Sequence, residues 1–261
     1  MYINLPSDGG SVEFPSNSNA RYTVNLGTEV NLDKGRWEVG LVSATYPHDF
    51  YNIPPRRITF FVNDEEPAEL DFPGGYFETI KDLLYAINFE INKHYYSVMD
   101  WNFRSYKKVA EQFKFGFELD YTGKVVFKIK PTSVAVTRAY VSLGNDLLAK
   151  MGYVSNQPDA GTVADMYPDI NAGLESIFVY CSIMRPNRVV GHQLLQVLRI
   201  LPVTGHHGRM TFHEPTHVEY FPIAQNNFSE IHIELRDNLG RLFPFNTGKT
   251  NIELHFKKKS I

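Results

Sequence analysis

The chain has 261 residues, of which 43% are hydrophobic, and this is enough to bury one large core. Its 26 basic and 29 acidic residues give a formal net charge of -3, so the overall charge gives no reason to expect a nucleic-acid partner. The single Cys181 cannot form an internal disulfide, and the start MYINLPSDGG lacks the features of a signal peptide. No segment reaches the roughly 20 apolar residues that span a bilayer. We therefore expect a protein without a membrane span that folds in the cell interior.

Short segments with alternating or β-branched residues recur along the chain, separated by Gly, Pro, Asn and Asp, as is typical of a β-sandwich or barrel. An aromatic content of 14% also favours half-buried β surfaces and subunit contacts. In the last predicted strand Ile252, Leu254 and Phe256 alternate with polar residues, which predicts one buried face. The predicted strands, in chain order, are Arg21–Leu26, Trp37–Tyr46, Ile58–Val62, Ala68–Phe72, Phe113–Leu119, Val125–Lys130, Ser176–Ile183, Leu194–Pro202, Met210–Phe212, His217–Ile223, Glu230–Leu235 and Asn251–Phe256.

Two short glycine-containing loops predict tight connections between strands. Asp120–Gly123 separates two β segments and predicts a hairpin, and Asp237–Gly240 predicts a second hairpin-like element. Helical spacing of apolar residues predicts a helix over Thr79–Lys93, with Thr79 and Asp82 as a capping pair, and a shorter one over Asn145–Met151.

These patterns predict a mainly β chain in which residues 1–261 form a single antiparallel sandwich domain. The two helices and the residues between them form a helix-containing elaboration at about 74–169. It ends in the turn-rich segment Ser155–Asn171, for which we expect an exposed loop.

Residues that could carry enzyme chemistry have simpler interpretations. His213 and His217 have the spacing of helical zinc ligands, but Pro215 lies between them and the surroundings indicate strand. Gly248-Lys249-Thr250 lacks the upstream glycine of a phosphate-binding loop, because position 243 is Phe243. Cys181 lies in an alternating strand, which favours a small core residue over a nucleophile. We expect no enzyme activity, no cofactor and no metal site.

Two sets of residues are candidates for contacts with other molecules. Aromatic residues near the end of the first helix could form a surface patch that stacks on sugar rings, as in a β-sandwich glycan- or receptor-binding module. A run of three lysines after the last strand forms a basic tail, the one place where nucleic acid could be touched. The aromatic set is Tyr95, Tyr96, Trp101 and Tyr106, and the tail is Lys257, Lys258 and Lys259.

Four long blocks of the sequence resemble one family, the penton or minor capsid proteins of Polinton/Maverick elements and their adintovirus-like relatives. The blocks are Gly35–Ile53 (GRWEVGLVSATYPHDFYNI), Pro73–Asn88 (PGGYFETIKDLLYAIN), Leu174–Val203 (LESIFVYCSIMRPNRVVGHQLLQVLRILPV) and Phe228–Phe256, which contains IHIELRDNLGRLFPF and NIELHF. They occur in order along nearly the whole chain.

This resemblance implies a jelly-roll capsid subunit that forms a homopentamer at the five-fold vertices of an icosahedral virion. It also implies a double-jelly-roll major capsid protein as the second partner. A closed ring uses heterologous contacts, so two different patches of each subunit must be complementary. Under this interpretation the protein acts through its geometry and has no active site.

Overall fold

The computed structural model divides the chain into two compact units. Unit 1 comprises Met1–Phe50 and Gly173–Ile261, and unit 2 comprises Tyr51–Ala172. Unit 2 is therefore one continuous insertion in the sequence of unit 1. The structure describes residues 1–9, 12–33, 36–63, 66–97, 115–130, 136–154, 158–190 and 192–259, without the side chains of residues 94–97.

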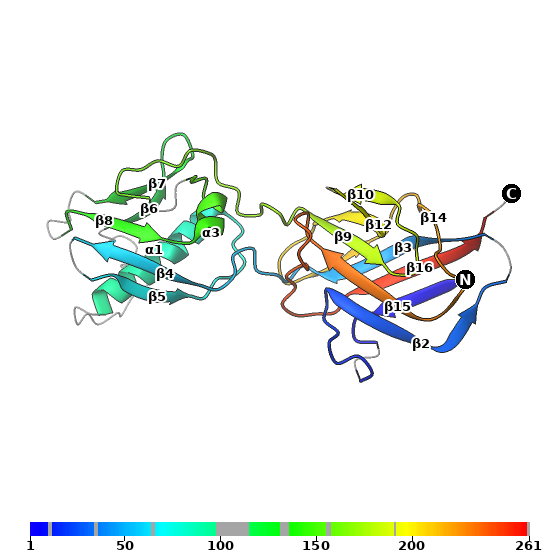
Figure 1. The fold of residues 1–261 in the computed structure, drawn as a ribbon. Helices are drawn as coiled ribbons and strands as arrows, with labels where there is room; N and C mark the ends of the chain where they lie inside the picture. The colour runs from blue at the N-terminus through cyan, green and yellow to red at the C-terminus, as the bar shows by residue number, and fades with distance from the viewer. Residues whose placement is uncertain are drawn as a thin grey trace. The chain divides into compact units, whose positions relative to one another are not determined.

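Unit 1 is built from two antiparallel sheets (Figure 1). Sheet A has the strand order β1-β16-β3-β13, with β14 also paired to β3, and sheet B has the order β12-β9-β15-β2. A separate hairpin joins β10 to β11. The strands of unit 1 are β1 (Tyr2–Pro6), β2 (Arg21–Asn31), β3 (Trp37–Pro47), β9 (Ser176–Cys181), β10 (Arg188–Val190), β11 (Gln193–Leu195), β12 (Val197–Pro202), β13 (Met210–His213), β14 (Phe221–Pro222), β15 (Asn227–Arg236) and β16 (Asn251–Lys258).

The pairing of these strands is nested from the outside of the sequence inward. The first strand β1 pairs with the last strand β16, and β2 pairs with β15. Further inward, β3 pairs with β13 and β14, and β9 pairs with β12. Successive nested pairs alternate between sheets A and B, which is the winding of a jelly roll. The predicted mainly β, jelly-roll-type sandwich is confirmed.

The inner faces of the two sheets form the core of unit 1. Alternation along β16 buries Ile252, Leu254 and Phe256, as the sequence predicts. Phe256 stacks on Phe228 of β15 with ring centroids 5.6 Å apart, and this contact joins sheet A to sheet B. The core is therefore made by strands from both ends of the chain.

Unit 2 contains a three-stranded sheet of order β5-β4-β8, the hairpin β6–β7 and two helices, α1 and α3 (Figure 1). Its apolar residues form a core of their own. The elements are β4 (Arg56–Val62), β5 (Ala68–Phe72), α1 (Ile80–Ser97), β6 (Phe115–Leu119), β7 (Val125–Ile129), β8 (Ala139–Ser142) and α3 (Asn145–Lys150).

Helix α1 forms where the sequence predicts it and is capped as expected. Asp82 Oδ2 accepts a hydrogen bond from the Thr79 backbone N–H at 3.1 Å, and the Asp82 N–H donates to Thr79 Oγ1 at 3.3 Å. The helical spacing places Leu83, Ile87 and Ile91 fully inside the core. Capping and burial together define the start and the orientation of the helix.

Several predicted strands differ from the structure. The segment Leu194–Pro202 is divided between β11 and β12, which belong to different sheets. Within the predicted strand His217–Ile223, Phe221–Pro222 pair with β3 and Ile223 forms an isolated bridge with Met184, whereas the preceding residues cross the outer face of β3. The predicted hairpin at Asp120–Gly123 is confirmed, with the Asp120 N–H donating to the Lys124 carbonyl at 2.8 Å.

The sequence prediction omitted β1, β8 and β10, which are short and carry few apolar residues in alternation. The elaboration expected at about 74–169 lies within unit 2, which begins at Tyr51. The segment Ser155–Asn171 was expected to be an exposed loop, and most of its described residues, from 158 onward, are exposed. It also pairs at isolated bridges with Tyr140 and Val126 and buries Ala164. That segment is therefore in part a packed layer of unit 2.

Candidate interaction surfaces

The aromatic patch predicted near the end of α1 lies largely outside the described residues. Tyr95 and Tyr96 belong to α1, but their side chains are outside the described part of the chain. Trp101 and Tyr106 are also outside it. The patch therefore stays a prediction.

The predicted basic tail lies against unit 1. Lys257 and Lys258 end β16, and Lys259 follows it. Lys258 Nζ lies 2.7 Å from a carboxylate oxygen of Asp33, and Lys259 Nζ lies 3.6 Å from Glu38. Such exposed ion pairs contribute little stability, but they place a carboxylate beside two of the three lysines of the tail.

The outer face of sheet A carries an aromatic cluster, defined here as Tyr2, Tyr220 and His255. The Tyr2 ring stacks on the His255 ring at a centroid distance of 4.4 Å, and Tyr220 meets it edge-on at 5.8 Å. The hydroxyl of Tyr220 lies 2.8 Å from His255 Nδ1, and Lys257 Nζ lies 3.7 Å from the centroid of the Tyr220 ring. Tyr2 is 64% exposed, so the cluster presents an aromatic surface to solvent.

Three distant segments bring this cluster together. Tyr2 and His255 are directly opposite each other in the β1–β16 ladder. His255 is opposite Gly40 of β3, where an added Cβ would lie 2.5 Å from the Val218 side chain. Glycine at position 40 therefore allows residues 218–220 to cross closely over the sheet and place Tyr220 beside His255.

The protonation state of His255 follows from its surroundings. Burial, the amino terminus and Lys257 together lower the pKa of His255 below its ordinary value of 6.5. The neutral ring can then accept a hydrogen bond from the Tyr220 hydroxyl at Nδ1. At pH 7 the cluster is therefore an uncharged aromatic surface beside one lysine.

Strand β13 adds a second apolar feature to the same outer face. Phe212 is opposite Thr45, whose neighbours Ala44 and Tyr46 are buried, so Phe212 points away from the core. Met210 lies on the same face. Met210 is 54% exposed and Phe212 is 64% exposed. Within the described residues β13 pairs with β3 alone, so one edge of this strand is left without a partner strand.

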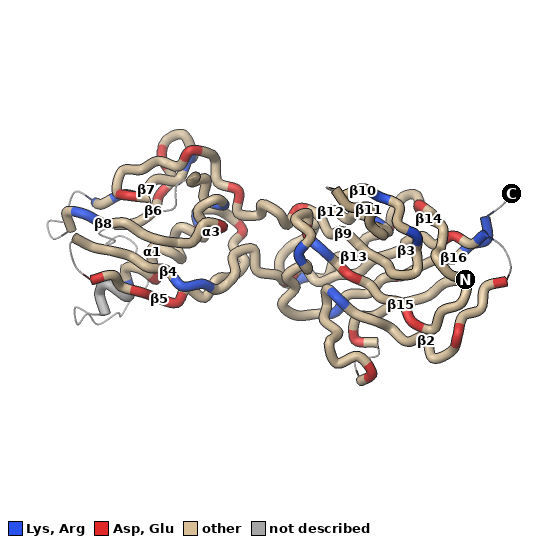
Figure 2. Tube along the Cα trace, viewed as in Figure 1, with Lys and Arg blue, Asp and Glu red and all other residues tan. Residues whose placement is uncertain are grey.

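The outer face of sheet B differs in character, because charged side chains on it bind one another. Figure 2 shows where the Lys, Arg, Asp and Glu residues lie along the chain. Glu234 of β15 pairs with Arg21 at 2.9 Å and with Arg236 at 2.6 Å. Burial raises the pKa of Glu234, but the hydrogen bonds and charges of Arg236, His232 and Arg21 outweigh it and hold the pKa below its ordinary value. These charged groups are therefore already paired within one chain.

The edge of sheet B at β2 is also blocked by side chains. The Asn17 amide N–H donates to the Thr23 carbonyl at 2.9 Å, and Asn17 Oδ1 accepts from the Thr23 N–H at 2.9 Å. The Ser18 backbone N–H donates to the Arg21 carbonyl at 2.7 Å, and Ser18 Oγ accepts from the Arg21 N–H at 3.1 Å. These contacts occupy the backbone groups of Arg21 and Thr23 that another strand would need at this end of β2.

Residues considered for catalysis do not form a reactive site in the described structure. Cys181 is 1% exposed, and burial raises the pKa of its thiol to about 12, so the prediction of a core residue is confirmed. The described residues contain no group of three or more His, Cys, Asp or Glu side chains placed to hold a metal ion. Of the two described helices, neither combines the length and apolar character needed to cross a membrane.

Comparison with known proteins gives a likeness at the level of structure. No protein-family model and no curated protein matches the sequence. Among solved structures, the crystal structure of the mavirus penton protein is similar over 99% of this chain and 99% of that chain, with a TM-score of 0.50 and 8% sequence identity. The likeness establishes a penton-like jelly-roll fold, in agreement with the nested strand order.

Proposed function

We propose that this chain is a viral structural protein, a penton or minor capsid subunit at the vertices of an icosahedral capsid. The observation that carries the proposal is the penton-like fold, which extends along the full chain. A fold by itself is compatible with several functions, so the character of the surface also matters. The outer face of sheet A has the exposed Tyr, Phe and Met residues that are enriched in protein interfaces.

The proposed subunit assembles as a ring of five copies. Ring closure needs two different patches on each copy, because the contact is heterologous. The outer face of sheet A, with the aromatic cluster and with Met210 and Phe212, is the proposed first patch. Its support is the contrast with sheet B, where Arg21 and Arg236 already bind the same carboxylate, that of Glu234.

The proposed ring is seated among double-jelly-roll major capsid proteins, so the protein resides in the virion after folding in the host cell interior. The support is the resemblance of four sequence blocks to Polinton/Maverick and adintovirus-like penton proteins. In this proposal unit 1 and its insertion act as one capsid domain. Lys257, Lys258 and Lys259 then have a structural role on sheet A, since they lie against Asp33, Glu38 and Tyr220.

The proposal is tested by the mass of the purified full-length chain at near-physiological salt. Mass photometry should find a species of five times the 29.9 kDa chain mass, and negative-stain images should show rings. Mixing with the major capsid protein of the same element should seat the rings at vertices. A chain that stays monomeric at micromolar concentration, alone and with that partner, would overturn the proposal and favour a β-sandwich binding module.

A further inference from the structure

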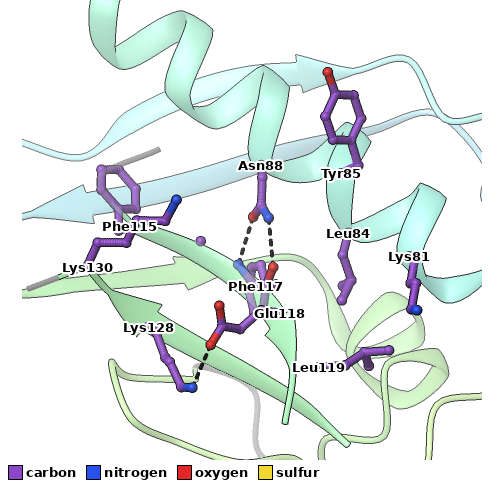
Figure 3. Close-up of a pocket in the computed structure, with 11 residues that line it drawn as sticks. Lys81, Leu84, Tyr85, Asn88, Phe115, Phe117, Glu118, Leu119, Lys128 and Lys130 are labelled. Carbon is purple, nitrogen blue, oxygen red and sulfur yellow. Dashed lines mark hydrogen bonds and ion pairs between the residues drawn. The ribbon is translucent and has the colours of Figure 1, made fainter. Parts of the chain in front are cut away.

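Unit 2 contains an open groove between the first turns of α1 and the hairpin β6–β7, with a volume of about 400 Å³ (Figure 3). The helix side of the groove is formed by Lys81, Leu84 and Tyr85, which follow one another on one face of α1. Tyr85 is 45% exposed and Lys81 is exposed, so both side chains can be reached from solvent. This wall therefore offers an aromatic ring beside a positive charge.

The groove has a fixed shape because α1 is bonded directly to β6. The Asn88 amide N–H donates to the Phe117 carbonyl at 2.7 Å, and Asn88 Oδ1 accepts from the Phe117 N–H at 2.7 Å. The residue before Phe117 is Gly116, and a glycine is required there because a Cβ would lie 2.5 Å from Asn88 Oδ1. The floor is therefore set by backbone contacts that do not depend on a ligand.

The hairpin side of the groove adds two lysines and one carboxylate. Lys128 lies 2.5 Å from Glu118, so this pair compensates its own charge. Lys130 and Lys81 are the other two lysines of the groove, and no carboxylate among the described residues pairs with either of them. The groove therefore has a local charge of about +2, opposite in sign to the formal net charge of -3 of the chain.

We propose that this groove binds an acidic sugar, meaning a saccharide ring that carries a carboxylate or a sulfate. Lys81 and Lys130 provide the charge-assisted hydrogen bonds for the anionic group, and the exposed face of Tyr85 provides the stacking surface for the ring. The volume is within the range of small-ligand sites. This inference goes beyond the capsid proposal and does not depend on it.

The composition of the floor favours a sugar over a lipid anion. Leu84 and Phe117 are only 4% and 2% exposed, so these two side chains offer an acyl chain little surface to cover. An acyl chain gains affinity from such burial, whereas a sugar ring needs one aromatic face and polar partners at the rim. The rim of this groove is made of lysine, tyrosine and glutamate side chains.

The test is a titration of the full-length protein with two anionic probes, 3′-sialyllactose for the carboxylate and a heparin-derived hexasaccharide for the sulfate. Lactose is the neutral probe. At least one anionic probe should bind in calorimetry, lactose should not, and Lys81→Gln or Lys130→Gln should each weaken binding by about tenfold. Tyr85→Ala should weaken it as well.

The matched control is Lys93→Gln, which removes the same charge from the same helix outside the groove, where Lys93 pairs with Glu90. This variant should bind like the original chain, and far-ultraviolet circular dichroism should show that all variants fold. Absence of binding by both anionic probes at millimolar concentration would overturn the proposal. Equal binding of lactose, or an equal loss in Lys93→Gln, would overturn it too.

Discussion

The two outer faces of the jelly roll differ in how their side chains are satisfied. On sheet B the charged groups of Arg21, Glu234 and Arg236 bind one another, and Asn17 occupies the free edge of β2. On sheet A exposed aromatic and apolar side chains lie beside polar pairs such as Ser43–Glu253, and β13 has no second partner strand among the described residues. The difference supports the proposal that sheet A, rather than sheet B, carries a contact between copies.

The largest effect should come from placing charge on the sheet A face. The double substitution Met210→Asp and Phe212→Asp should raise the dissociation constant of the ring by about a hundredfold, because truncating or charging central apolar contacts costs about 2 kcal/mol or more. Sedimentation velocity across a concentration series measures this. Glu230→Lys, on the sheet B face, is the control and should leave assembly unchanged. If the double variant formed rings as tightly as the control, sheet A would not be the contact face.

Opening the blocked edge of sheet B should have the next largest effect. Asn17→Ala removes two hydrogen bonds from the backbone of Thr23, so we expect a loss of about 1–2 kcal/mol in the free energy of unfolding. The exposed edge should also increase aggregation. Urea denaturation and light scattering measure the two effects. Asn31→Ala, at the end of β2, should show neither a loss of stability nor more aggregation. Equal behaviour of the two variants would contradict the blocking role of Asn17.

A smaller effect should come from the charged network of sheet B. Glu234→Gln leaves Arg21 and Arg236 without their shared negative charge and should cost about 1 kcal/mol of stability at pH 7, without changing assembly. Because the pKa of Glu234 is lowered on folding, its contribution is present above its ordinary value of 4.5 and is lost as pH falls through the folded value. The stability difference between the variant and the original chain should therefore shrink in acid.

The smallest effect should be a pH dependence from His255. Its pKa is lowered on folding, so its contribution is complete above the ordinary value of 6.5 and is lost as pH falls from there through the folded value. We expect a loss of less than about 1 kcal/mol, since the ring is only partly buried. His213 has a pKa shifted in the same direction. Comparison of His255→Gln with the original chain between pH 7.5 and 5 isolates the contribution, and identical profiles would contradict it.

Local patterns predicted the elements of this fold better than their arrangement. The alternation in Asn251–Phe256 and the helical spacing in Thr79–Lys93 both correspond to observed elements, because each pattern reflects burial of one face. The boundary between β11 and β12 was missed, since both segments are apolar and the change of sheet is a tertiary event. The nested pairing itself has no local signal and was not predicted; the resemblance to penton proteins implied only a jelly-roll subunit.

The aromatic cluster could not be predicted from neighbouring residues. Tyr2, Tyr220 and His255 are far apart in the sequence, and their contact depends on the β1–β16 register and on the close crossing at Gly40. The aromatic patch predicted from the sequence consists instead of residues that are near one another in the chain, namely Tyr95, Tyr96, Trp101 and Tyr106. Period-two alternation does place His255 on the outer face, but it does not say which side chains join it.

The nested pairing has a consequence for synthesis on the ribosome. Strand β16 is made after the other described strands, yet it pairs with both β1 and β3, so sheet A stays incomplete until β16 emerges. The described strands of unit 2 pair with one another within residues 51–172, so this unit can fold during translation. A polypeptide released too early would therefore carry a folded insertion but no finished sheet A, and it would be excluded from any structure built on that sheet.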